Sequence, residues 1–130
     1  MPTDILIPYF DDGDNVTGYC TANVVGKTFL AISGNLYTDN TFSVATCPAN
    51  AKPFGVAEYD ASTGQWIGIV RKGIVPVTCG AAGSLTAGQE VMSDASGNAI
   101  AWDTTVGHRP AGMVCTAATP GQDAMIALYR

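Results

Sequence analysis

Apolar and polar residues alternate along short stretches of the chain, and glycine-rich turns separate these stretches. The pattern is clearest between Phe54 and Trp102. Within it, the apolar residues Val75, Val77 and Cys79 stand at every second position. A period of two places alternate side chains on opposite faces of a strand. We therefore predict a strand over Gly73–Cys79.

Two turns in this stretch have nearly the same sequence, at Asp60–Gly64 and at Asp94–Gly97. The aspartate of each turn can accept a hydrogen bond from the backbone of its own turn, and the glycine can take the positive φ that the return needs. We therefore predict two tight β-hairpins, one on each side of the strand at Gly73–Cys79.

The rest of the chain also favours strands over helices. No window of 11 residues shows a helical period of 3.6, and turn signals roughly every ten residues are typical of all-β domains. The predicted fold is all-β, a small single-domain β-barrel or sandwich. Further strands are expected at Thr28–Ile32, Gly112–Thr116 and Ala124–Arg130, with a pair of short strands in Leu36–Thr46.

Residues 1–20 differ from the residues that follow. The apolar patch Ile5-Leu6-Ile7 lies between Pro2 and Pro8, and a run of acidic residues comes next. Prolines suit an edge strand or an arm better than a central strand, and an extended arm can add a strand to a neighbour's sheet. We divide the chain into an N-terminal arm or first strand at 1–20 and a β domain at 21–130.

Composition and charge indicate which classes of binding partner are expected. Charged residues make up 13% of the chain, about half of the usual share of about 25%, so much of the surface is neutral or packs against other chains. The net charge is −5, and Arg71 and Lys72 are the only adjacent basic residues. Nucleic acid is therefore not an expected partner. A membrane is not expected either, because no apolar run approaches 18 residues.

The four cysteines form no CxxC pair, which gives no support for a zinc site. Their even count would permit two disulfides. The first residues lack the basic start and the apolar run of a secretory signal, so we expect synthesis in a reducing cytoplasm, with buried free thiols rather than bridges.

The sequence offers no convincing catalytic, cofactor or metal site. His108 is the only histidine, and no GxSxG motif accompanies it. The acidic run Asp11–Asn15 lacks the ligand spacing of a calcium loop, and Val24–Thr28 lacks the first glycine of a phosphate-binding loop. Trp66 and Trp102 follow the two similar turns. Such aromatic residues can stack on a sugar or base but more often fill a core or a subunit contact.

The order of glycines and strands in the second part of the chain resembles the small capsid decoration, or cement, proteins of tailed bacteriophages. The resemblance covers about residues 54–130. The stretches that carry it are Phe54–Ala57, Val70–Val77, Ala87–Val91, Asp94–Gly97, Gly112–Val114 and Gln122–Leu128.

This resemblance implies a structural virion protein that catalyses nothing and needs no cofactor. Such proteins are made in the cytoplasm of the bacterial host and bind the outer surface of an assembled icosahedral capsid. There they clamp neighbouring major capsid protein subunits, often as homotrimers. An alternative is a β-barrel glycan-binding or adhesion module of a phage or cell surface. The expected capsid or subunit contacts are Ile5, Leu6, Ile7, Pro8, Tyr9, Arg71, Lys72, Trp66 and Trp102.

Overall fold

The computed structural model describes residues 15–38 and 41–129 of the chain. These residues form ten short strands. The strands are β1 (Asn15–Cys20), β2 (Phe29–Ile32), β3 (Phe42–Thr46), β4 (Gly55–Ala57), β5 (Trp66–Val70), β6 (Ile74–Thr78), β7 (Glu90–Ser93), β8 (Ala99–Ala101), β9 (Gly112–Thr116) and β10 (Asp123–Leu128).

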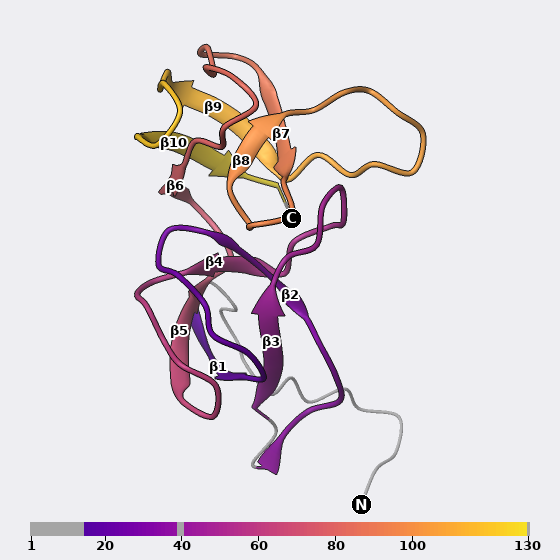
Figure 1. Ribbon diagram of the computed structural model, residues 1–130, viewed down its shortest axis with the longest axis vertical. Coiled ribbons are helices and arrows are strands. Elements are labelled where there is room, and N and C mark those ends of the chain that lie inside the picture. The colour runs from indigo at the N-terminus through magenta and orange to yellow at the C-terminus, as the bar shows by residue number, and fades with distance from the viewer. Residues whose placement is uncertain (1–14, 39–40, 130) are drawn as a thin grey trace, which may run out of the picture.

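The first five strands close into a barrel, and the last five form a second sheet (Figure 1). The barrel order is β1-β3-β2-β4-β5, and β5 pairs back onto β1 from Val70 opposite Asn15 to Trp66 opposite Tyr19. The pair β1–β3 is parallel, and the other barrel pairs are antiparallel. The second sheet has the order β6-β10-β9-β7-β8 and is antiparallel throughout. The predicted all-β fold is confirmed.

The two sheets share a hydrophobic core. One cluster of buried side chains fills the barrel and includes Leu30, Ile67 and Ile69. The other cluster belongs mainly to the second sheet, but Phe29 and two neighbours from the barrel half contribute to it. Burial of this common apolar surface holds the barrel and the second sheet together. The barrel-half residues of this shared cluster are Phe29, Cys47 and Val56.

Hydrogen bonds also join the two sheets. The backbone N–H of Phe29 donates to the carbonyl of Gly97, in the turn between β7 and β8, over 2.7 Å. The N–H of Thr78 donates to the carbonyl of Lys27 over 2.9 Å. The Lys27 ammonium in turn pairs with the Asp123 carboxylate at 2.7 Å. The end of the second sheet is thereby fastened to the turn that precedes β2.

Most strands agree with the sequence prediction. The strand expected at Gly73–Cys79 is β6, and the strand expected at Gly112–Thr116 is β9. In the segment Leu36–Thr46, where two short strands were expected, β3 is one, and an isolated bridge between Tyr37 and Thr41 stands in place of the other.

The two turns of similar sequence have different structures. The second is a tight hairpin between β7 and β8, as predicted. The first joins the antiparallel pair β4 and β5, but through a longer connection over residues 58–65. The Asp60 carboxylate there accepts the N–H of Gly26 over 2.7 Å. The prediction that Asp60 binds the backbone of its own turn was wrong, because the turn packs against the loop before β2.

Asp94 holds the tight hairpin together, which gives a stability prediction. Its Oδ1 accepts the N–H groups of Ser96 at 2.9 Å and Asn98 at 2.8 Å, and Gly97 has a φ of +79°. Asp94→Ala should lower the free energy of unfolding by about 1.5 kcal/mol, because two donors lose a charged acceptor. Urea unfolding measures this loss. Ser96→Ala is the control, since it keeps both N–H groups, and equal midpoints for the two variants would contradict the assignment.

Only part of the predicted N-terminal segment lies within the described residues, which begin at Asn15. Residues 15–20 form β1 and are part of the barrel. Ile5, Leu6, Ile7, Pro8 and Tyr9 lie outside the described residues, and the arm stays a prediction. The described residues contain no helix that could cross a bilayer.

All four cysteines are free, but the prediction that their thiols are buried is wrong for Cys115. Three of them are buried, and Cys115 is exposed. Burial raises the pKa of the Cys20, Cys47 and Cys79 thiols, so these groups stay protonated and act as small apolar core residues.

Candidate contact surfaces

Three aromatic rings gather on the outside of the barrel where β5 begins. Tyr19 and Trp66 are directly opposite each other in the β1–β5 pair, and their ring centroids are 5.6 Å apart in an edge-to-face arrangement. Tyr37 stacks on Tyr19 with a centroid distance of 3.8 Å. Trp66 is 51% exposed and Tyr37 is 42% exposed. We call Tyr19, Tyr37 and Trp66 the aromatic cluster.

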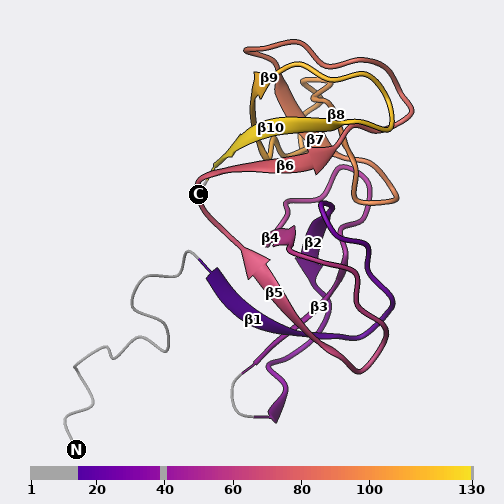
Figure 2. The same ribbon diagram turned by 90° about the vertical axis from the view of Figure 1, so that its left-hand side faces the viewer.

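The position and charge of the aromatic cluster suit a contact surface. β5 begins at the end of the barrel that lies away from the second sheet (Figure 2), and Trp66 is its first residue. A hydrogen bond with Tyr37 raises the pKa of Tyr19, so its phenol is neutral at physiological pH. The cluster therefore offers an exposed aromatic surface with phenol hydroxyl groups, as protein interfaces often do.

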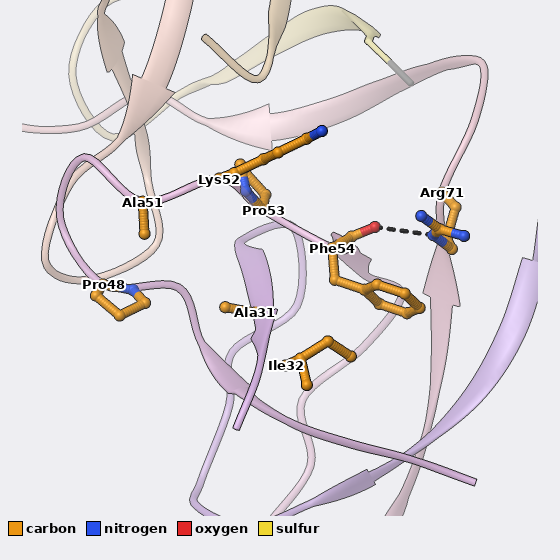
Figure 3. A pocket seen from close by; sticks show the side chains of 8 residues that line it. All are labelled: Ala31, Ile32, Pro48, Ala51, Lys52, Pro53, Phe54 and Arg71. Atoms are coloured by element: carbon orange, nitrogen blue, oxygen red, sulfur yellow. Dashed lines mark hydrogen bonds between the residues drawn. The ribbon is translucent and has the colours of Figure 1, made fainter. Parts of the chain in front are cut away.

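Arg71 forms one wall of a shallow groove on the side of the barrel (Figure 3). Its Nε donates to the carbonyl of Phe54 over 3.0 Å, and its guanidinium carbon lies 4.1 Å from the centre of the Phe54 ring. Both contacts fix the arginine in place. The groove measures about 440 Å³, and we call it the barrel groove. Its lining residues are Ala31, Ile32, Pro48, Ala51, Lys52, Pro53, Phe54 and Arg71.

Lys72 is exposed in the turn that connects the barrel to the second sheet. Gly73 follows it with a φ of +105°, a conformation that favours glycine. The two adjacent basic residues thus lie between the end of β5 and the start of β6. Arg71 faces the barrel groove, while Lys72 is displayed on the connecting turn.

Trp102 is half-buried and supports a projecting loop. Its indole Nε1 donates to the carbonyl of His108 over 3.1 Å. The loop covers residues 102–111 between β8 and β9 and extends away from the body of the protein (Figure 1). Val106 is 99% exposed. Trp66 and Trp102 therefore do not form one site, because Trp66 belongs to the barrel and Trp102 follows β8.

Asp103 stabilises the same loop. Its carboxylate accepts the N–H of Thr105 over 3.0 Å and lies 2.8 Å from Nδ1 of His108. The hydrogen bond from the backbone of Thr105, followed by the contacts with His108, lowers the pKa of Asp103. These contacts give the only histidine a structural role in the loop. Within the described residues, no group of three His, Cys, Asp or Glu side chains could hold a metal ion.

Sequence reasoning named Trp66 but missed its two partners. Tyr19 lies on the outer face of β1 because Gly18 and Cys20 on either side are buried, and strict alternation could have revealed this. Its pairing with Trp66 joins two segments that are remote in the sequence, and no local pattern encodes that pairing. Val106 was missed because an exposed loop residue leaves no periodic signal.

The family match completes this description. The phage cement protein family matches residues 10–129, which include the barrel as well as the second sheet. The chain belongs to the phage cement protein family. It is therefore a structural protein that associates with the phage capsid, and the resemblance seen at residues 54–130 is confirmed over nearly the whole chain.

A solved structure shows that this cement protein shares its fold with another phage protein. The chain is similar to the N base of head fiber gp8.5 in bacteriophage phi29, with a TM-score of 0.72 and 20% sequence identity. The alignment covers 88% of this chain and 92% of that chain. At this identity the likeness concerns the fold. A comparison with curated proteins finds no match.

Proposed function

We propose that this cement protein binds the outer surface of the assembled icosahedral capsid and clamps neighbouring major capsid protein subunits, as a homotrimer. The observation that carries the proposal is the family match over residues 10–129. Exposed large apolar side chains support it, because a subunit that works in an assembly buries such groups against its partners. In the barrel half these are Val25, Ile32, Leu36, Tyr37, Tyr59 and Trp66.

The physical mechanism is linkage between binding and assembly. A protein that binds only the assembled shell stabilises that shell by mass action. A standard interface of about 800 Å² per partner is sufficient for stable binding, and many copies on one shell multiply the effect. A rigid body suits this role, and the shared core of the two sheets provides one.

The contact surface that we propose is centred on the aromatic cluster. Exposed Trp and Tyr side chains are enriched among the residues that dominate binding energy. Lys72 on the connecting turn and the segment Ile5–Tyr9 are the further contacts expected from the sequence. Arg71 would act beside Lys72, and Trp102 would act through the loop that it supports.

Co-sedimentation with expanded, undecorated phage capsids tests the proposal. We expect saturable binding at a fixed ratio of this protein to capsid subunits, and light scattering of the free protein should give the mass of a trimer. A lack of binding to any shell would overturn the capsid role. A monomer that nevertheless saturates the shell would overturn the trimer and leave the capsid role in place.

Truncation of Trp66 should weaken capsid binding. The side chain is half-exposed and held by two neighbouring tyrosines, so Trp66→Ala removes a preorganised anchor with little cost to the core. We expect the affinity for capsids to fall about tenfold or more. Met113→Ala is the matched control, since Met113 is also exposed but lies on β9 of the second sheet. Equal affinities of the two variants would remove the aromatic cluster from the contact.

Removal of residues 1–9 tests the N-terminal segment separately. If Ile5–Tyr9 contacts the shell, the truncated protein should sediment with capsids less tightly, because an extended segment contributes main-chain hydrogen bonds and apolar burial. The barrel should remain folded, since its first strand begins at Asn15. Binding at full strength after the truncation would show that the arm is not a contact.

A glycan-binding or adhesion module is a second candidate, and one observation favours it. Trp66 exposes about half of its surface next to Tyr37, and aromatic faces of this kind can stack on sugar rings. A glycan array distinguishes the two functions. Binding of the wild-type protein that Trp66→Ala abolishes, together with no binding to capsids, would favour the glycan.

A further inference from the structure

The barrel groove combines an apolar floor with basic groups at its rim (Figure 3). Ile32 on its floor is 49% exposed, although it belongs to a barrel strand. Lys52 and Arg71 lie among the residues that line the groove. An extended peptide with apolar and acidic residues would complement this surface, because its apolar side chains would cover the floor while its carboxylates face the basic groups.

The chain itself contains such a peptide. Ile5, Leu6 and Ile7 are consecutive apolar residues, and acidic residues follow them closely. No lysine or arginine occurs before Lys27. The N-terminal segment therefore has the composition that the groove would recognise. Its acidic residues after the apolar patch are Asp11, Asp12 and Asp14.

The register of β1 places Asn15 close to the groove. Asn15 pairs with Val70 in an antiparallel arrangement. The chain before Asn15 is therefore tethered beside Arg71, which directly follows Val70 and lines the groove. An extended chain spans about 3.3 Å per residue, so the residues between Ile7 and Asn15 could span roughly 25 Å. This tether is long enough for the apolar patch to lie along the groove.

We propose that the barrel groove binds the chain's own Ile5–Ile7 patch in the free protein. Tethering favours this occupant, because a short flexible linker gives an effective concentration in the millimolar range. Charge also favours it, since the segment is acidic and the groove carries two basic residues. The groove would shelter an apolar segment until a partner competes for it. The inference concerns the free protein and does not depend on the proposed capsid role.

Disulfide trapping tests the proposal. In a Cys115→Ser background, which removes the exposed thiol, Ile32→Cys is combined either with Leu6→Cys or with Ile7→Cys. Neighbouring side chains of an extended segment point in opposite directions, so one of the two pairs should bring its sulfurs together. A disulfide needs Cα atoms within about 7 Å of each other. Intact mass and peptide mapping after mild oxidation identify the bond.

We expect one pair to form a disulfide within a single chain, at least about tenfold faster than a control pair. The control joins Ile7→Cys to Thr119→Cys, because Thr119 is exposed in the turn between β9 and β10 of the second sheet. A rate no faster than the control would overturn the proposal. A disulfide between two chains would also overturn it, and would place the segment in the groove of a second copy. Co-sedimentation of the wild-type protein tests the capsid role separately.

The charge argument has its own test in the same assay. Replacing Asp11, Asp12 and Asp14 with asparagine should slow the intramolecular disulfide about threefold at low salt, because the attraction to Lys52 and Arg71 is lost. Asp4→Asn is the control, since Asp4 precedes the apolar patch. Salt should reduce the difference, as it screens exposed charges. An unchanged rate in the triple variant would overturn the assignment of Lys52 and Arg71 as the groups that hold the segment.

Discussion

Phe29→Ala is expected to destabilise the barrel and the second sheet together, by about 4 kcal/mol. Phe29 belongs to β2 of the barrel and is fully buried. Its side chain packs in the cluster that contains Val77 and Ile126 of the second sheet. The substitution leaves a cavity where the two sheets meet, and the loss therefore comes from both the missing apolar burial and the empty space.

The two tryptophans allow the unfolding of the two sheets to be followed separately. Trp66 reports on the barrel, and Trp102 follows β8 of the second sheet. A Trp102→Phe background leaves Trp66 as the fluorescent reporter, and a Trp66→Phe background leaves Trp102. Urea unfolding of Phe29→Ala in each background should show a transition shifted to the same lower midpoint. Phe29→Leu is the control and should cost about 1 kcal/mol, because it keeps most of the buried volume. A shift confined to the Trp66 signal would mean that the sheets do not unfold as one unit.

This cooperativity matters for the proposed function. A clamp transmits force between capsid subunits only if its own parts do not separate under load. The bonds from Phe29 to Gly97 and from Lys27 to Asp123 cross from one sheet to the other, and the shared core reinforces them. A variant whose two sheets unfold independently should therefore protect capsids less well, even with its contact residues intact.

The second sheet was easier to predict from the sequence than the barrel. The strand at Gly73–Cys79 shows a period of two, and the hairpin at Asp94–Gly97 contains its own turn signals. Local chemistry encodes both features. The barrel depends on the pairing of β1 with β5 and with β3. These contacts join remote segments, and only the complete fold brings them together.

The candidate contact residues also show the difference between what local sequence encodes and what depends on the complete fold. Trp66 could be named because it follows a recognisable turn, and the structure places it on the surface. Trp102 follows a similar turn, yet its indole N–H serves the loop that carries His108. The difference arises from the surroundings of each residue, since the carbonyl of His108 accepts the indole N–H of Trp102, whereas Trp66 lies against Tyr19 and Tyr37. A turn signal gives the position of an aromatic residue but not what packs around it.

Gly112→Ala is expected to lower the free energy of unfolding by about 3 kcal/mol, a large effect for one methyl group. Gly112 begins β9 and pairs with Leu128 on one side and with Val91 on the other. A Cβ at this position would overlap the carbonyl oxygen of Ala127 and would lie 2.7 Å from Cγ2 of Ile126. The oxygen belongs to the backbone of β10, so it cannot move aside as the end of a flexible side chain could.

Relief of this overlap would require β9 and β10 to separate, which would weaken the ladder at the centre of the second sheet. Thermal unfolding should therefore show a fall in Tm of roughly 10 °C. Gly34→Ala is the matched control, because the nearest atom to its Cβ would be 3.9 Å away and alanine reduces the freedom of the unfolded chain. Similar Tm values for both variants would mean that β9 and β10 tolerate a wider spacing, and that the close approach at Gly112 is not a requirement of the fold.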